Sequence, residues 1–359
     1  MTGLRRLRTT LLAAALALSV AGVASAATPR EFFGVMVDGP ALDPDRSLAA
    51  ETRLMASSGV GSVRVAFYWR SMQPREGEPV DFTESDRVVA AAARAGLRVF
   101  PTLVRAPAWA TGGDEREGAV PLDPETYARF AADFVRRYGR GGTFWAESPS
   151  LPARPMFSFQ VWNEPDIGRY WEADPWPSSY VRLLRAARPA IKGVDPRAQV
   201  VAAGLTNESW EDLRRLYDAG ARGLFDAAAI HPFSKRPSNV VKIVRLARGV
   251  MVRARDGAVP LVLTELSWSS GRGQSTFNYG WETTERGQAE RVRQILPMLA
   301  RERRRLRIQA LYWYTWLSPR KGERESFSYA GLRRLGEDGR PVSKPALRAF
   351  RATVAKLRR

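Results

Sequence analysis

The chain has 359 residues, contains no cysteine and carries a formal net charge of +19 at pH 7. The absence of cysteine excludes a disulfide framework and a lipid-anchored bacterial lipoprotein, so the folded chain depends on its apolar core. A basic surface is compatible with nucleic acid, an anionic cell-wall polymer or an acidic polysaccharide as partner. The arginines are scattered along the chain and cluster only at 301–307, without an aromatic or glycine-rich binding pattern. We therefore expect no nucleic-acid partner.

The first 26 residues have the features of an export signal. Three arginines precede an apolar run over 11–23, and a small-x-small cleavage sequence ends at Ala26. The apolar run is short for a membrane span and has no stop-transfer flank. The residues around Arg5-Arg6 fit a twin-arginine signal poorly, which favours ordinary secretion. We predict a secreted chain over 27–359 with no stable insertion in a membrane.

Short apolar segments alternate along the rest of the chain with longer amphipathic ones. The short segments have the length and composition of buried strands, and the longer ones repeat apolar residues at helical spacing. In chain order, the predicted strands cover 32–37, 62–67, 97–104, 157–161, 199–203, 227–231, 261–265 and 310–315. The helices that follow them cover 45–58, 83–96, 124–138, 180–191, 210–219, 240–251, 292–299 and the residues from 345 onward.

Eight strands that alternate with eight helices have the count of a (β/α)8 barrel. Right-handed crossovers between sequential strands close such a chain into a barrel. The last helix takes up the C-terminus, and no linker-like segment interrupts 27–359. We predict the α/β class, a (β/α)8 TIM barrel formed by a single domain over 27–359, and a monomer.

The fourth predicted strand ends in Trp162-Asn163-Glu164-Pro165. Proline stops sheet pairing there because it has no N–H to donate and restricts the residue before it. Glu164 is therefore the last side chain of the strand, at the end where parallel α/β folds place their chemistry. The alternative is that Glu164 caps the next helix or pairs with an arginine.

The seventh predicted strand also ends in a glutamate, Glu265. Period-two counting places Leu261, Leu263 and Glu265 on one face, so we expect the two leucines to line the barrel below the carboxylate. In a closed barrel, Glu164 and Glu265 emerge at the same rim and can face each other. Two facing carboxylates, one protonated and one ionised, are what cleavage of a glycosidic bond requires. This repeated position favours a functional role over two structural glutamates.

These motifs resemble those of the clan A retaining glycoside hydrolases. With Trp69 and Pro74, the segments 96–99, 107–110 and 162–166 are most similar to family 39 and its relatives. The resemblance covers nearly the whole chain after the export signal. It implies a retaining mechanism, with Glu164 as acid/base and Glu265 as nucleophile.

The resemblance also implies substrate-binding residues. Asn163 would hold the sugar 2-hydroxyl, and Arg64, on the second strand, would contact the nucleophile. Trp316, after the eighth strand, would form an aromatic platform under the sugar. The alternatives are an ordinary ion pair for Arg64 and core packing for Trp316.

His231 is the only histidine of the chain and ends the sixth predicted strand. Its place on the same rim favours a role in the site. Since no other metal ligands cluster near it in the sequence, we predict no metal and no cofactor. The family has His-x-Tyr here, with the tyrosine hydroxyl on the nucleophile, whereas this chain has His231-Pro232-Phe233. Loss of that hydroxyl would raise the pKa of Glu265 or loosen its orientation.

Four tryptophans follow predicted strands on the rim side, where indole rings can stack on sugars. They are Trp69, Trp109, Trp268 and Trp281. One alone would be ordinary packing, but four together predict a cleft with aromatic walls.

The sequence therefore predicts a secreted retaining O-glycoside hydrolase that cleaves β-glycosidic bonds of a polysaccharide or oligosaccharide. The basic composition adds an acidic or cell-surface polysaccharide as a candidate substrate. Two alternatives stay open: a catalytically weakened carbohydrate-binding protein, suggested by Phe233, and a transglycosylase that uses the same two carboxylates.

Overall fold

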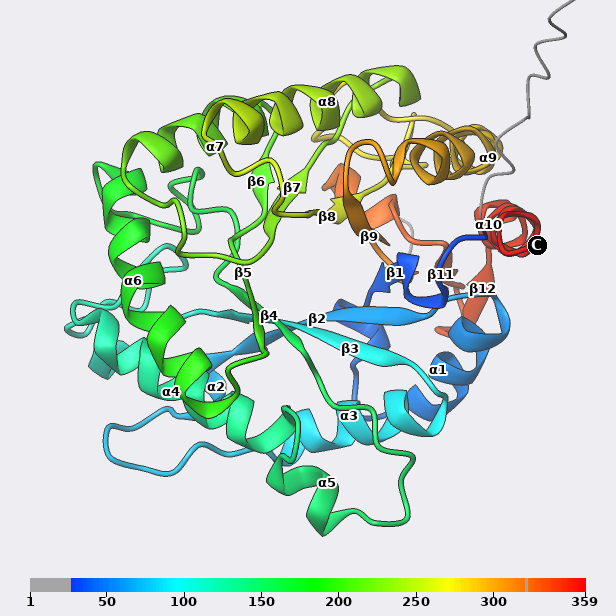
Figure 1. The fold of residues 1–359 in the computed structure, drawn as a ribbon. Helices are drawn as coiled ribbons and strands as arrows, with labels where there is room; N and C mark the ends of the chain where they lie inside the picture. Colours follow the sequence, from blue (N-terminus) through cyan, green and yellow to red (C-terminus); the bar gives the residue numbers. More distant parts are fainter. Residues whose placement is uncertain (1–26, 320–321) are drawn as a thin grey trace, which may run out of the picture.

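The computed structural model describes residues 27–319 and 322–359; the predicted export signal lies outside these ranges. Parallel strands occupy the centre of the molecule, and helices surround them (Figure 1). The central strands are β1 (Phe33–Met36), β2 (Ser62–Tyr68), β3 (Arg98–Val104), β4 (Ser158–Val161), β5 (Gln199–Val201), β6 (Leu205–Thr206), β7 (Ala228–His231), β8 (Leu261–Leu266) and β9 (Ile308–Trp313). The helices are α1 (Leu48–Ser57), α2 (Trp69–Met72), α3 (Thr83–Arg94), α4 (Pro124–Tyr138), α5 (Thr143–Glu147), α6 (Trp176–Val194), α7 (Ser209–Asp218), α8 (Pro237–Arg253), α9 (Glu285–Glu302) and α10 (Pro345–Leu357).

The central sheet closes on itself. Its strands pair in the order β5-β4-β3-β2-β1-β9-β8-β7-β6, and neighbouring strands run parallel. β5 and β6 are two halves of the fifth barrel strand, separated by 202–204. A bridge between Val201 and Ala227 joins the first half to the next strand, and β6 continues the pairing with β7. The predicted (β/α)8 TIM barrel is therefore confirmed.

Alternate residues of the barrel strands face two separate cores. The larger core lies between strands and helices and includes Leu261 and Leu263. The smaller core contains strand residues such as Phe100, Val262 and Tyr312, and it fills the inside of the barrel. The expectation that Leu261 and Leu263 line the barrel is therefore wrong: they pack outward against helices, and Val262 faces inward.

The helices bury the faces that the sequence pattern predicts. In α4, six residues at helical spacing are buried, and Asp123 begins the helix by accepting a hydrogen bond from the N–H of Glu125 at 3.0 Å. Full burial of one such phenylalanine stabilises the fold by about 1.5–3 kcal/mol. No helix within the described ranges has the length and apolar content to cross a membrane.

A second, three-stranded sheet precedes the last helix and was not predicted. It consists of β10 (Leu317–Ser318), β11 (Arg333–Leu335) and β12 (Pro341–Ser343). A buried ion pair between Arg333 and Glu51 of α1 attaches this sheet to the barrel. The following helix, α10, packs against α9 beside the first strand (Figure 1). Thr28 donates hydrogen bonds from its N–H and hydroxyl to the carbonyl of Leu357, so the two ends of the described chain meet.

Candidate active site

The candidate site lies inside the barrel at the C-terminal ends of its strands. Arg64 comes from β2, Glu164 from the segment after β4, His231 from the end of β7, and Glu265 from β8. A parallel barrel brings these strand ends to one rim. The structure therefore brings together residues that are far apart in the sequence.

The chain leaves the sheet abruptly at Glu164. Trp162 and Glu164 have positive φ values of 66° and 47°, a conformation uncommon for residues other than glycine. Two hydrogen bonds of 3.0 Å hold this turn, from the N–H of Trp162 to Leu103 O and from the N–H of Glu164 to Gly204 O. The neighbouring strands thus fix the backbone that presents the carboxylate.

The two carboxylates face each other with the histidine between them. One oxygen of Glu164, one oxygen of Glu265 and one ring nitrogen of His231 all lie within 4.8 Å of one another. Carboxyl groups about 5–5.5 Å apart suit a double displacement at a sugar carbon, whereas about 6.5–9.5 Å leaves room for an intervening water. The close approach fits the first arrangement.

Glu265 is paired with a buried arginine. Arg64 is 1% exposed and donates from Nη1 to Glu265 Oε1 and from Nη2 to Asn163 Oδ1, each at 2.7 Å. Nε of Arg64 donates to Gln160 Oε1 at 3.3 Å, which fixes the plane of the guanidinium. Burial raises the pKa of Glu265, while His231 and Arg64 oppose the rise. The direct ion pair favours the ionised form of Glu265.

Glu265 reaches the interior through an irregularity in β8. The pairing register with β9 shifts between Leu263 and Leu266, and such a shift turns side chains toward a different face. Thr264 also reaches the interior, where its hydroxyl contacts His231. Alternation along the strand therefore predicted the correct rim for Glu265, although it wrongly placed Leu261 and Leu263 on the same face as Glu265.

Glu164 has the opposite electrostatic setting. Within the described residues, no arginine or lysine forms an ion pair with it, and Nδ1 of His231 lies 2.7 Å from its Oε1. Burial raises the pKa of Glu164 to about 8, and the charge of Asp166 adds to the rise. Glu164 is therefore protonated at neutral pH, while Glu265 is held by a cation.

His231 is neutral and connects the two carboxylate environments. Burial lowers its pKa to about 4. When both groups are neutral, a proton on Glu164 Oε1 is donated to Nδ1, and the N–H at Nε2 points to Thr264 Oγ1 at 2.9 Å. This tautomer follows from the two contacts of the ring.

Gly204 makes room for the imidazole. A Cβ at this position would lie 2.1 Å from Nε2 of His231. Gly204 stands between β5 and β6, and its carbonyl also holds the N–H of Glu164. The sequence analysis missed this residue because nothing in the local pattern indicates which side chain packs on a glycine.

Glu164, His231 and Glu265 lie close enough together to bind one metal ion. The expectation that no other metal ligands cluster near His231 is wrong, since two carboxylate oxygens lie within 4.8 Å of a ring nitrogen. Arg64 already forms an ion pair with Glu265, and the imidazole of His231 already forms a hydrogen bond with Glu164. These existing partners make proton transfer the chemistry that the arrangement best supports.

Three of the five tryptophans that were predicted to contact sugar are part of the core. Trp69, Trp268 and Trp316 are fully buried, so the prediction that they stack on sugar is wrong. Trp69 stacks on Phe130 at 5.5 Å, and the indole N–H of Trp316 donates to Glu51 at 2.6 Å. An indole after a strand can turn toward the helices as readily as toward the rim.

The other two tryptophans are placed differently. Trp109 is half-buried and packs edge-on against Trp69, with ring centroids 5.3 Å apart. Its contact with a substrate stays a prediction. Trp281 is 8% exposed and stacks on Phe233 at 5.5 Å.

Two tyrosines at the carboxylates were not predicted. Tyr314 directly follows β9 and interacts electrostatically with Glu164, Glu265 and Asp38, and Tyr170 interacts with both glutamates. Asp38 is a further carboxylate at this rim, and burial raises its pKa. Tyr314, rather than Trp316, is thus the aromatic residue that the last barrel strand brings to the site. The sequence analysis missed it because the predicted strand, 310–315, included Tyr314, whereas β9 ends at Trp313.

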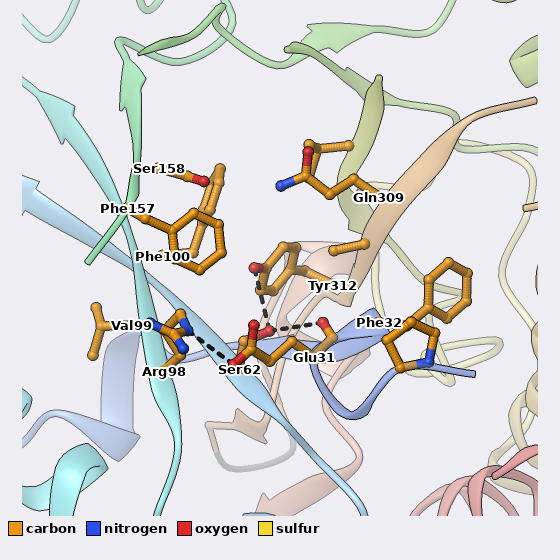
Figure 2. A pocket seen from close by; sticks show the side chains of 13 residues that line it. Glu31, Phe32, Ser62, Arg98, Val99, Phe100, Phe157, Ser158, Gln309 and Tyr312 are labelled. Atoms are coloured by element: carbon orange, nitrogen blue, oxygen red, sulfur yellow. Dashed lines mark hydrogen bonds and ion pairs between the residues drawn. The ribbon is translucent and has the colours of Figure 1, made fainter. Parts of the chain in front are cut away.

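A separate cavity of about 270 Å³ lies at the other end of the barrel. Figure 2 shows Ser62 bonded to Tyr312, and Arg98 paired with the single carboxylate of Glu31. Small inward residues such as Ser158 and Ala310 leave this space open. It contains no pair of carboxylates, so we place the candidate active site at the C-terminal rim.

No protein-family model matches the chain, and no curated protein matches it in sequence. Solved structures do match. A family 39 glycoside hydrolase from the gut symbiont Bacteroides cellulosilyticus WH2 has 18% identity and a TM-score of 0.68, covering 92% of this chain and 64% of that one. A monomeric β-xylosidase from Caulobacter crescentus CB15 has 18% identity and a TM-score of 0.66, covering 91% of this chain and 68% of that one.

An exo-β-1,4-mannosidase from Opitutaceae bacterium strain TAV5 has 18% identity and a TM-score of 0.61, covering 91% of this chain and 59% of that one. The chain thus spans less than two thirds of the length of some of these proteins. At such identities, the likeness shows the fold. It is the barrel fold that these glycoside hydrolases have, as the alternation of strands and helices predicted.

Proposed function

We propose that the protein is a retaining O-glycoside hydrolase that cleaves β-glycosidic bonds of an oligosaccharide or polysaccharide. One observation carries the proposal: Glu164 and Glu265 approach within 4.8 Å, and only Glu265 is paired with arginine. Two carboxyl groups of the same kind are thereby given different protonation states. Retaining hydrolysis needs this difference.

In the proposed reaction, each carboxylate has its own step. Glu265 attacks the anomeric carbon as the bond to the leaving oxygen breaks, and the proton of Glu164 passes to that oxygen. Glu164, now ionised, takes a proton from a water that attacks the same carbon and releases Glu265. Two inversions give a product of retained configuration.

The remaining contacts support these steps. Nη2 of Arg64 donates a hydrogen bond of 2.7 Å to Asn163 Oδ1, so the asparagine amide has a fixed direction. His231 lies within hydrogen-bond distance of Glu164 and is itself uncharged at neutral pH. Two of the structural neighbours, a β-xylosidase and an exo-β-1,4-mannosidase, support the same reaction class.

A second candidate, a carbohydrate-binding protein with weakened catalysis, is favoured by Phe233. Its ring stacks on Trp281 at an interplanar angle of 16° and has no hydroxyl to donate to Glu265. Turnover and binding must therefore be measured separately.

The decisive experiment is hydrolysis of a glycan panel by the purified protein, with the anomeric configuration of the first product followed by NMR. Glu164→Ala should still be glycosylated by substrates with good leaving groups and yield a retained azide adduct. Glu265→Ala should yield the inverted adduct with azide. Glu31→Ala, which removes a glutamate at the opposite end of the barrel, should leave the rate unchanged. An inverted product from the unaltered protein would contradict the proposed retaining mechanism.

We also propose that the chain is exported and that its basic surface attracts an anionic glycan. The arginine-rich start and the net charge of +19 support this. The N-terminal sequence of protein collected outside the cell should begin at Ala27. Binding to an acidic glycan should weaken with added salt, because exposed charges are screened over about 8 Å at physiological ionic strength.

A further inference from the structure

A series of aromatic rings leads from the histidine of the site to the outer surface. Phe233 lies edge-on to His231 at 6.4 Å and stacks on Trp281 at 5.5 Å. Trp281 in turn stacks on Tyr279 at 6.1 Å, with an interplanar angle of 22°. Phe277 packs edge-on against Tyr279 at 5.3 Å. Three of the five rings come from the loop between β8 and α9.

The rings become more exposed with distance from the site. Trp281 is 8% exposed, Tyr279 47% and Phe277 57%. Isolated exposed apolar residues are normal on a protein surface, whereas adjoining aromatic rings that continue into a cleft mark a binding surface.

Hydrogen bonds hold the loop in place without a ligand. The carboxylate of Glu282 accepts from the N–H groups of Tyr279 and Gly280, at 2.7 and 2.9 Å, and from the hydroxyl of Ser326 at 2.7 Å. The phenol of Tyr279 donates to Glu325 at 3.0 Å. A surface ordered in advance loses less conformational entropy when it binds.

One of the outer rings also interacts with a tyrosine of the site. Tyr279 interacts electrostatically with Tyr170, and Tyr170 interacts with Glu164 and Glu265. Tyr170 follows β4, whereas Tyr279 follows β8. The exposed rings are therefore continuous with the proposed site.

We infer that Phe277 and Tyr279, here named the β8-loop platform and supported from behind by the buried ring of Trp281, bind sugar units of a glycan beyond the unit held at the two carboxylates. Flat aromatic faces that pass from a carbohydrate site to the surface match the apolar C–H faces of consecutive sugar rings. This deepens the proposed function and rests on it: the substrate is a chain of several sugars rather than a small glycoside.

The experiment compares substrate lengths in a variant of the platform. Michaelis constants are measured on cello-, xylo- and mannohexaose and on aryl β-glycosides of the same single sugars. Tyr279→Leu keeps apolar volume and removes the flat ring, so it should raise KM for the hydrolysed hexasaccharide at least about tenfold. Its kcat, and both constants for the aryl glycoside, should stay unchanged. Tyr279→Phe should retain the KM of the unaltered protein, and Leu122→Ala, at an apolar residue that is 74% exposed, serves as the control.

A calorimetric arm separates this inference from the proposed function. If the protein hydrolyses nothing but binds a hexasaccharide, and Tyr279→Leu alone weakens that binding, the platform holds and the hydrolase proposal fails. Equal rises in KM for long and short substrates would overturn the platform. So would unchanged constants, or no binding of any hexasaccharide by the unaltered protein, which would leave an apolar protein partner as the occupant.

Discussion

At the scale of single residues, the site distinguishes two glutamates by their neighbours. Glu265 has a guanidinium at 2.7 Å, and Glu164 has an imidazole at the same distance. Glu265 is buried and the side chain of Glu164 is only 12% exposed, so each carboxyl group depends mainly on its partner rather than on water for its protonation state. The two residues therefore respond differently to pH and to loss of a neighbour.

The first prediction concerns pH. As the proton donor, Glu164 must be protonated, and burial raises its pKa to about 8, so kcat/KM should fall as pH rises through about 8. At low pH, protonation of Glu265 should also remove activity, which gives a bell-shaped profile. Glu164→Ala, assayed on a substrate with a good leaving group, should lose the basic limb. A variant that keeps this limb would show that another group controls it.

The second prediction concerns Arg64. Arg64→Met leaves Glu265 buried without its cation, so its pKa should rise and turnover should fall by at least about 100-fold. Breaking a buried ion pair on one side costs about 3–5 kcal/mol of unfolding free energy, whereas a surface pair contributes about 0–1 kcal/mol. Arg75→Met serves as the matched control, because Arg75 forms its ion pair with Glu78 while 76% exposed. Urea unfolding and initial rates check both expectations.

At the scale of elements, the site depends on departures from regular strands. The fifth barrel strand is interrupted between β5 and β6, and Gly204 in this gap accommodates His231. The seventh barrel strand, β8, shifts its register between Leu263 and Leu266, and Glu265 lies within the shift. The regular parts of the strands provide the support, and the irregular parts direct the side chains.

The third prediction tests the gap in the fifth strand. In Gly204→Ala, the new methyl carbon would lie 2.1 Å from His231 Nε2, so the imidazole must move away from Glu164. We expect kcat to fall at least about 100-fold and the basic limb of the pH profile to shift.

Gly193→Ala is the control for that substitution. Gly193 lies in α6 with nothing within 4 Å of an added Cβ, and alanine there should stabilise the helix by about 0.5–1 kcal/mol. Full activity of Gly204→Ala would contradict the proposed role of the gap.

Part of this architecture could be predicted from the sequence. The strand and helix periods placed the barrel, and the ends of α4 agree with the predicted 124–138. The prediction that Glu164 is the last side chain of the strand is wrong, because β4 ends at Val161 and Glu164 lies in the turn that follows. The facing of Leu261 could not be predicted, because both sides of a barrel strand are buried and alternation does not say which side is which. The burial of Trp316 depended on Glu51, which is 265 residues away in the chain.

At the scale of the whole molecule, closure joins distant parts of the chain. β1 pairs with β9, α10 packs on α9, and Thr28 bonds to Leu357. The chain contains no cysteine, so these contacts rather than cross-links hold the ends. Loss of one end should therefore affect the entire barrel.

The fourth prediction is cooperative unfolding. Tryptophan fluorescence and far-ultraviolet circular dichroism should report the same urea midpoint, and a reductant should not change it. Truncation after Ser343 removes α10 and should prevent folding, because it exposes the apolar faces of α9 and β1. Two separated transitions would contradict a single folding unit.

The composition of the chain gives one buried feature a spectroscopic use. His231 is the only histidine, so a protein labelled with ¹⁵N at histidine has a single pair of imidazole nitrogen resonances that require no assignment. When Glu164 loses its proton near pH 8, Nδ1 must change from hydrogen-bond acceptor to donor toward it, and Nε2 must make the reverse change toward Thr264. The two resonances should exchange chemical-shift positions across that pH, whereas Glu164→Gln should abolish the exchange. The protonation of the proposed catalytic acid can thus be followed without a substrate.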